Sequence, residues 1–285
     1  MKKDEIPPGR RTLLRVGACL AAAAAVRMLT AEDTGPAEGA AAEAAAGPAG
    51  GAQAAAAPRL KSTAYRLAPM TAAAPPQYRT ALPPVRRRPF LSMPELGPQT
   101  MVLTFDDGPD PRYTPQILKT LREHDVRAMF FVCGEMATDN RDLLREMHDD
   151  GHVIGNHSWT HPLLIKMSRD AVRDEMTRTS EVIEEVLGER PQWFRAPYGA
   201  WNRNSFQIGA QLGMEPMGWT LDTLDWTTPG TDTIVRRVRE GAAPGVVVLS
   251  HDAGGDRSQS VAALRTYLPR LLTSGYRLRV PPKRR

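Results

Sequence analysis

The chain has 285 residues, of which 41% are hydrophobic, and its formal net charge of +5 is unevenly distributed. Residues 1–99 hold 13 Lys and Arg against 7 Asp and Glu, residues 100–280 hold 21 against 25, and residues 281–285 hold 3 against none. No nucleic-acid partner is expected, because a nucleic-acid-binding domain carries its basic excess on the fold itself. The two basic ends could still contact an anionic cell surface.

Residues 1–31 are predicted to be an export signal of the twin-arginine type. Arg10 and Arg11 precede an Ala-rich, mildly apolar segment at 16–26, which is the order found in such signals. A disordered basic start is the alternative to a signal. An uncleaved N-terminal anchor is a second alternative, although the segment is too short and too weakly apolar to predict a membrane span. We therefore expect a secreted, extracytoplasmic protein. After removal of the signal Cys133 is the only cysteine, which excludes an intramolecular disulfide.

Residues 32–98 are predicted to be a disordered linker. They consist mainly of Ala, Pro and Gly with scattered charges, and no helical or strand period is sustained. Such a segment cannot bury enough apolar surface to offset the entropy lost on ordering. Pairs such as Pro75-Pro76 and Pro83-Pro84 favour an extended, stiff chain.

Residues 99–280 alternate short apolar runs with amphipathic stretches and are predicted to form one folded domain, followed by a basic tail at 281–285. Strands are predicted at 101–105, 128–133, 152–156, 193–196, 216–221, 246–249 and 276–280. Helices are predicted at 114–124, 140–149, 168–187, 202–212, 231–240 and 261–273. About seven strands alternating with helices predict an α/β fold with a parallel sheet, open or closed as a barrel. The Glu- and Arg-rich helix at 168–187 is expected to present a solvated charged face.

The most informative stretch follows the first predicted strand and reads Thr104-Phe105-Asp106-Asp107-Gly108-Pro109. Two adjacent carboxylates at the end of a buried strand are costly unless a cation meets them. A strand-end turn is the alternative, because Asp, Gly and Pro are all common turn residues. The stretch therefore raises the question of whether the chain supplies a cation site.

Two histidines offer the remaining ligands of such a site. His157 and His161 follow the strand predicted at 152–156, and residues four apart fall on one face of a helical turn. With Asp107 they form a two-histidine, one-carboxylate set that leaves positions for water and substrate. We expect one divalent ion, Zn²⁺ first and Co²⁺ or another divalent ion otherwise. A pair of surface histidines at a turn is the alternative.

Three further strand ends carry polar motifs that are weak when taken singly. One is Arg195-Ala196-Pro197-Tyr198-Gly199, whose turn can aim a backbone N–H at an oxyanion. The other two are Asp222-Thr223-Leu224-Asp225-Trp226 and Val248-Leu249-Ser250-His251-Asp252. An arginine or a histidine at the end of a strand is as often solvated or structural as it is catalytic.

Together the five motifs resemble, in order and over residues 100–280, the polysaccharide deacetylases of carbohydrate esterase family 4, the NodB homology domain. The resemblance implies a deformed (β/α) barrel and the following roles. The catalytic residues would be Asp106 as general base, Arg195 orienting it, Tyr198 donating its N–H to the oxyanion, and His251 as general acid tuned by Asp225. The metal ligands would be Asp107, His157 and His161, and the substrate-binding residues Trp226, Leu249 and Pro197, of which Trp226 and Leu249 line the pocket for the acetyl methyl group.

The implied activity is metal-dependent removal of N-acetyl groups from N-acetylglucosamine in peptidoglycan or a chitin-type polymer, by a protein expected to be monomeric. An amide is a poor electrophile with a poor leaving group, so a metal, a base and an acid are all needed. One alternative is an O-deacetylase such as an acetylxylan esterase, whose ester is the easier substrate. The other is a non-catalytic glycan-binding module, which would be expected to lack Asp106 or His251.

Overall fold

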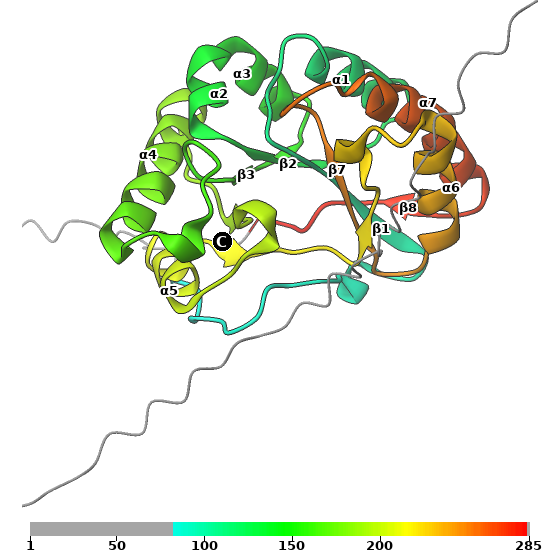
Figure 1. Cartoon of the computed structure of the whole chain (residues 1–285). Helices are drawn as coiled ribbons and strands as arrows, with labels where there is room; N and C mark the ends of the chain where they lie inside the picture. The colour runs from blue at the N-terminus through cyan, green and yellow to red at the C-terminus, as the bar shows by residue number, and fades with distance from the viewer. Residues whose placement is uncertain (1–81, 284–285) are drawn as a thin grey trace, which may run out of the picture. The chain divides into compact units, whose positions relative to one another are not determined.

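A computed structural model describes residues 82–283, and its centre is a sheet of eight parallel strands. The order along the sheet is β5-β4-β3-β2-β1-β7-β6, with β8 paired to β1 (Figure 1). The export signal or anchor predicted at 1–31 lies outside the described residues. The strands are β1 (Thr100–Asp106), β2 (Met129–Val132), β3 (Val153–Asn156), β4 (Trp193–Phe194), β5 (Glu215–Pro216), β6 (Leu221–Asp222), β7 (Val247–His251) and β8 (Arg277–Leu278).

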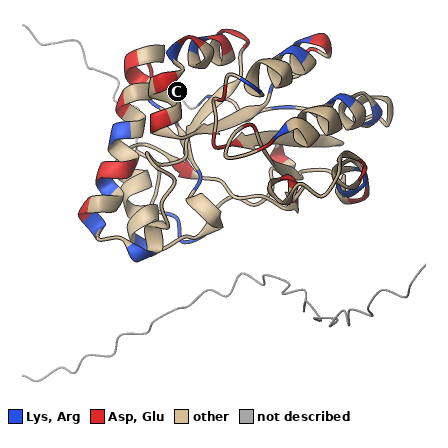
Figure 2. Ribbon diagram, turned by 45° about the horizontal axis from the view of Figure 1, so that its top comes forward, with Lys and Arg blue, Asp and Glu red and all other residues tan. Residues whose placement is uncertain are grey.

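The described residues form seven α-helices, which lie around the sheet (Figure 1). Six of them confirm the predicted helices, whereas α2 is too short for a helical period to be visible in the sequence. The ribbon segments coloured for Lys, Arg, Asp and Glu lie mostly on the helices (Figure 2). Within 82–283 no helix is long and apolar enough to cross a membrane. The helices are α1 (Thr114–Glu123), α2 (Gly134–Asp139), α3 (Arg141–Asp149), α4 (Arg169–Leu187), α5 (Arg203–Gln211), α6 (Thr231–Gly241) and α7 (Ser258–Thr273).

The sheet is curled, and one segment of chain joins its two edges. The single strand predicted at 216–221 is two strands: β5 pairs with β4, and β6 pairs with β7 at the other end of the strand order. Only residues 217–220 separate them, so the chain steps directly from one edge of the sheet to the other. The prediction of a deformed (β/α) barrel is thereby confirmed, and the interruption between β5 and β6 is its deformation.

Side chains that alternate along the central strands belong to two separate cores, and a third cluster packs Phe194 of β4 against α4 and α5. Val102, Met129, Phe131 and Val247 belong to a small cluster with Met93, Trp193 and Met217. Their neighbours in sequence, such as Leu103 and Phe130, belong to a larger cluster that includes residues of the surrounding helices. Because successive side chains of a strand point to opposite faces, the small cluster fills the barrel and the large one fixes the helices to it.

The packed part of the chain begins before residue 99, inside the segment predicted as a linker. Phe90 forms a parallel bridge with Met217, and Ser92 forms an antiparallel bridge with Val246. Met93 is 2% exposed, and the Arg86 guanidinium donates to both carboxylate oxygens of Glu215. Isolated apolar residues among prolines and arginines thus dock on the seam between β5 and β6, which composition alone does not reveal.

Candidate active site

The predicted site residues lie at the carboxyl ends of neighbouring parallel strands. The last residue of β1, Asp106, is paired in register with the last residue of β7, His251. The others follow their strands closely: Asp107 follows β1, His157 follows β3, Arg195 follows β4, and Asp225 opens the 3₁₀ helix η4 (Asp225–Thr227) after β6. Polar groups far apart in the sequence are therefore collected at one edge, as in other parallel α/β folds.

Asp107, His157 and His161 have the geometry of a metal site. One donor atom from each lies within 4.8 Å of the other two. Asp107 Oδ1 is 3.5 Å from His157 Nε2 and 3.4 Å from His161 Nε2. Metal–donor bonds of about 2.1 Å at tetrahedral angles place neighbouring donors about 3.4 Å apart. The spacing therefore fits an ion at a common centre.

The protonation and hydrogen bonding of these side chains also fit a cation. His157 Nδ1 donates to the backbone oxygen of Arg195 at 2.8 Å, so Nε2 is the ring nitrogen that faces Asp107 and can bind an ion once it is deprotonated. Asp107 Oδ1 is buried and has no hydrogen-bond partner among the described residues. Burial raises the pKa of Asp107, but its interactions with His157 and the charges of His251 and His161 lower it to about 2. A buried anionic oxygen of this kind is stabilised when a cation meets it.

Asp106 is held beside this site by a buried arginine. Arg195 is 1% exposed, and its Nη1 donates to Asp106 Oδ1 at 2.7 Å and to Thr104 Oγ1 at 2.8 Å. The other guanidinium nitrogens donate to the backbone oxygens of Met217 and Gly218. Asp106 Oδ2 lies 3.6 Å from His157 Nε2. One carboxylate oxygen is thus engaged by Arg195 while the other faces the candidate metal site at His157.

His251 is paired with a second buried carboxylate. Its Nδ1 donates to Asp225 Oδ1 at 2.7 Å, and its backbone N–H donates to Asp225 Oδ2 at 2.9 Å. The Ser260 hydroxyl also donates to Asp225 Oδ2, at 2.6 Å. Burial lowers the pKa of His251, but the hydrogen bond to Asp225 and the negative charges of Asp225, Asp106 and Asp107 outweigh it and raise the pKa to about 9. The raised pKa favours the protonated imidazole at neutral pH, and the bond from Nδ1 to Asp225 orients the ring.

The remaining predicted residues differ in how closely they approach the centre. Tyr198 lies in the 3₁₀ helix η3 (Pro197–Gly199) with a left-handed φ of 60°, and its ring meets the His161 ring edge-on at 4.6 Å between centroids. Pro197 and Leu249 are buried. Trp226 is 55% exposed, so it extends from η4 into solvent and does not share the burial of Leu249.

Two buried carboxylates near the site were not singled out by the sequence. Asp252 is fully buried directly after His251, and Glu175 lies on α4 under the His157–His161 turn. The charged face predicted for this helix is largely exposed, and Glu175 is the exception to it. The signal for it is positional: with Val172, Met176, Thr179 and Ile183 it falls on the buried stripe of α4, where a charged residue is unusual.

Asp252 fixes the turn that carries Asp107. Its Oδ1 accepts from the Gly108 N–H at 3.2 Å, and its Oδ2 accepts from the Thr114 hydroxyl at 2.6 Å. A Cβ at position 108 would lie 2.1 Å from Asp252 Oδ2. The turn after β1 therefore packs against Asp252 so tightly that only glycine fits.

Gly108→Ala is expected to destabilise the fold by about 1–3 kcal/mol, because the added methyl group must displace a buried, hydrogen-bonded carboxylate. It should also weaken metal binding, since residue 107 moves with the turn. Thermal denaturation and a zinc competition titration measure the two effects. An alanine variant with wild-type stability and zinc affinity would show that the turn is not constrained in this way.

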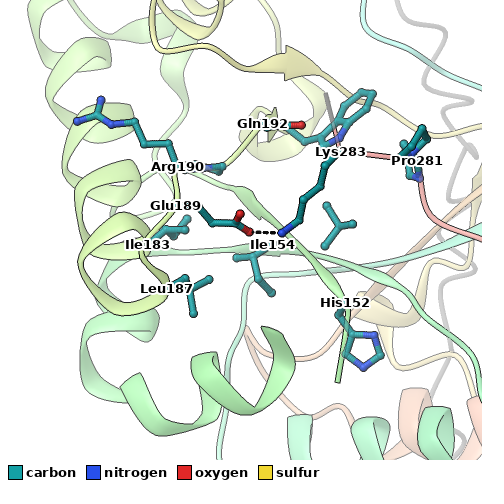
Figure 3. Close-up of a pocket in the computed structure, with 13 residues that line it drawn as sticks. His152, Ile154, Ile183, Leu187, Glu189, Arg190, Gln192, Pro281 and Lys283 are labelled. Carbon is teal, nitrogen blue, oxygen red and sulfur yellow. Dashed lines mark hydrogen bonds and ion pairs between the residues drawn. The ribbon is translucent and has the colours of Figure 1, made fainter. Parts of the chain in front are cut away.

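A cavity of about 40 Å³ lies at the opposite ends of the strands (Figure 3). Its lining includes His152 and Gln192, which precede β3 and β4, and the Lys283 ammonium pairs there with Glu189 at 2.6 Å. Among the described residues the only metal-ligating cluster of three or more such side chains is the one at Asp107. This cavity therefore lacks the groups that the five motifs bring together at the other end of the barrel.

Comparison with known proteins places these features in a family. Residues 94–217 match the family model described as polysaccharide deacetylase. The chain is 38% identical over 178 residues to a peptidoglycan-N-acetylglucosamine deacetylase of Bacillus cereus, covering 62% of this chain and 65% of that protein. It is 37% identical over 196 residues to a chitooligosaccharide deacetylase of Rhizobium leguminosarum bv. trifolii, covering 65% of this chain and 91% of that protein.

A solved structure has the same architecture. A CE4 family pseudoenzyme from Bacillus anthracis superposes with a TM-score of 0.63 at 31% identity, covering 68% of this chain and 67% of that one. The barrel, the motifs and these similarities together show that the chain belongs to the polysaccharide deacetylases of carbohydrate esterase family 4.

Proposed function

We propose that the chain is a metal-dependent hydrolase that removes N-acetyl groups from N-acetylglucosamine residues of peptidoglycan or a chitin-type polysaccharide. The observation that supports this most is the presence of three chemically distinct groups at one edge of the sheet. They are the Asp107, His157 and His161 ligand set, the Asp106–Arg195 pair, and the His251–Asp225 pair. Both relatives are named as deacetylases, one of N-acetylglucosamine in peptidoglycan and one of chitooligosaccharides, which supports cleavage of the N-acetyl amide bond.

Each group has a separate task in amide hydrolysis. A divalent ion, for which we propose Zn²⁺, would be held by Asp107, His157 and His161 and would supply Lewis acidity toward the acetyl carbonyl and water. Asp106, oriented by Arg195, takes the proton of the attacking water as general base. The Tyr198 N–H, in the first turn of η3 where N–H groups have no partner within the helix, donates to the oxyanion.

The amine leaves only when it is protonated, and His251 is arranged to provide that proton. Its Nε2 is free of the Asp225 contact, which is made through Nδ1, and its raised pKa keeps the proton available at neutral pH. Proton transfer to the amine nitrogen accompanies cleavage of the C–N bond, so that acetate and a free amino sugar result. No covalent intermediate with the protein is required. We propose that Leu249, Pro197 and the exposed Trp226 contact the acetyl group and the sugar of the substrate.

The non-catalytic alternative has a specific observation behind it, because one similar structure is a pseudoenzyme. The fold therefore cannot establish activity, and the proposal depends on the site residues. Asp106 and His251 are both present, and each is hydrogen-bonded to a buried side chain, Arg195 or Asp225. A binding module has no need of a cationic histidine held by a buried carboxylate, which favours the enzyme.

We expect the protein to release acetate from chitooligosaccharides or peptidoglycan, to stop when a chelator removes the metal, and to recover when Zn²⁺ or Co²⁺ is restored. Acetate release across a panel that includes acetylated xylan measures this and compares N- with O-deacetylation. A folded, zinc-loaded protein that releases no acetate from any of these polymers would contradict the proposal. Glycan binding that persists without turnover would then support the binding module.

We also propose that the protein acts outside the cytoplasm as a monomer, with residues 1–31 as its export signal. A polymeric substrate in the wall and the twin arginine at Arg10 and Arg11 support this location. Fractionation of cells that produce the full chain tests it. Replacement of both arginines by lysine should keep the protein in the cytoplasmic fraction.

A further inference from the structure

Glu175 is a buried carboxylate on a helix whose other charged residues are mostly exposed. It is 8% exposed, whereas Asp174, Arg178 and Glu181 on the same helix are exposed. Within residues 82–283 no Lys, Arg or His lies within ion-pair distance of the Glu175 carboxylate, although many other acidic side chains have such a partner. A buried carboxylate without a cation must be stabilised by hydrogen bonds.

All the hydrogen bonds that the Glu175 carboxylate accepts come from one turn. Its Oε2 accepts from the backbone N–H of Trp159 at 2.7 Å and of Thr160 at 2.9 Å. Its Oε1 accepts from the Thr160 hydroxyl at 3.0 Å. Trp159 and Thr160 stand between the two histidine ligands, His157 and His161. The carboxylate is therefore attached to the segment that determines the distance between those two ligands.

The opposite side of the turn is held by main-chain bonds from α2. The Gly134 N–H donates to the Ser158 oxygen at 3.0 Å, and the Glu135 N–H donates to the Trp159 oxygen at 3.3 Å. A Cβ at Gly134 would lie 2.2 Å from the Trp159 ring, so the turn is also confined sterically. Helix α2 thus binds the carbonyl groups of the turn while Glu175 binds its N–H groups.

The turn needs this support because its backbone is strained. Ser158 has a φ of 66° and His161 a φ of 58°, both in the left-handed region that residues other than glycine rarely adopt. Such conformations persist only where surrounding contacts determine them. Without the Glu175 carboxylate, the Trp159 and Thr160 N–H groups would lose their acceptor and the strained turn could relax.

We propose that Glu175 is a positioning residue for the metal centre, which sets the separation and orientation of His157 and His161 through the turn between them. The inference rests on the proposed function in that it takes these histidines as metal ligands. It predicts an effect on metal binding itself, independently of whether any glycan is hydrolysed.

The test compares Glu175→Ala and Glu175→Gln with Glu181→Ala, an exposed glutamate of the same helix, in the full-length protein. Zinc affinity by competition with a chromogenic chelator should fall about 10–100-fold in Glu175→Ala, the usual cost of losing a partner that orients a ligand. The visible absorption spectrum of the Co²⁺-loaded variant should change as well. Glu175→Gln keeps an acceptor oxygen for both N–H groups and should restore most of the affinity, and Glu181→Ala should match the wild type.

A folded Glu175→Ala protein with wild-type zinc affinity and an unchanged Co²⁺ spectrum would overturn the inference. If that variant does not fold, Glu175→Asp replaces it, since the shorter side chain keeps the charge but draws the acceptors away from the turn. Wild-type zinc affinity in folded Glu175→Asp would then overturn the inference, and a loss would support it. A wild-type protein that binds zinc normally but releases no acetate would contradict the proposed function and leave this inference standing.

Discussion

Asp106→Asn is expected to reduce kcat by about 10²–10⁴-fold, the usual contribution of a general base, and to leave metal affinity close to that of the wild type. Asparagine can still accept from Arg195 through its Oδ1, as Asp106 does at 2.7 Å, so the side chain should stay in place. It cannot take a proton from water at neutral pH. Single-turnover acetate release and a zinc competition titration measure the two quantities separately.

Asp107→Asn is the matched variant, because it makes the same chemical change one residue further along the same turn. Asp107 Oδ1 is the buried oxygen that faces both histidine nitrogens, so its loss of charge should weaken zinc binding strongly. Turnover should recover in part when zinc is added in excess, whereas Asp106→Asn should not respond. Equal loss of metal in the two variants would contradict the separation of base and ligand proposed here.

The sequence points to the proposed site residues because each motif ends an apolar strand with polar residues that a buried position does not tolerate. It could not show that Asp106 and His251, which are 145 positions apart, are direct neighbours. Only the pairing of β1 with β7 brings them together, and that pairing depends on which strands are adjacent in the sheet. The resemblance to a known family placed both residues in one site, but it did not predict that their strands are paired.

The parts that the sequence did not reveal are those where tertiary contacts override local pattern. The apolar run at 216–221 has the composition of one strand, yet it is divided because its two halves bond to different edges of the sheet. Glu175 lies in a charge-rich helix, and its burial follows from the His157–His161 turn packed above it. The division of the strand cannot be deduced from its own residues. The helical period puts Glu175 on the buried stripe of α4, but it does not show which turn the carboxylate meets.

Asp225→Asn is expected to move the alkaline limit of activity from near pH 9 to pH 6.5 or below. The reason is the direction in which Asp225 shifts the pKa of His251. Burial lowers this pKa, but the hydrogen bond and charge of Asp225 are the main causes that raise it to about 9. The acid works only while it is protonated, so activity falls as pH rises through its pKa. Without the charge of Asp225, burial should leave the pKa at or below the ordinary 6.5. At pH 8 the protonated fraction, and kcat with it, should fall about thirtyfold.

The pH profile of kcat distinguishes this effect from general damage to the site. As the pH falls below the lowered pKa, His251 becomes protonated in both proteins, so the difference in kcat should shrink steadily toward acid pH. Asp222→Asn is the matched control, because Asp222 acts on His251 through charge alone while its Oδ1 accepts from the Leu224 N–H at 2.8 Å. Its alkaline limit should move far less. If Asp225→Asn lowered kcat by the same factor at every pH, Asp225 would be holding the position of His251 without controlling its proton, and the general-acid role would have to be assigned elsewhere.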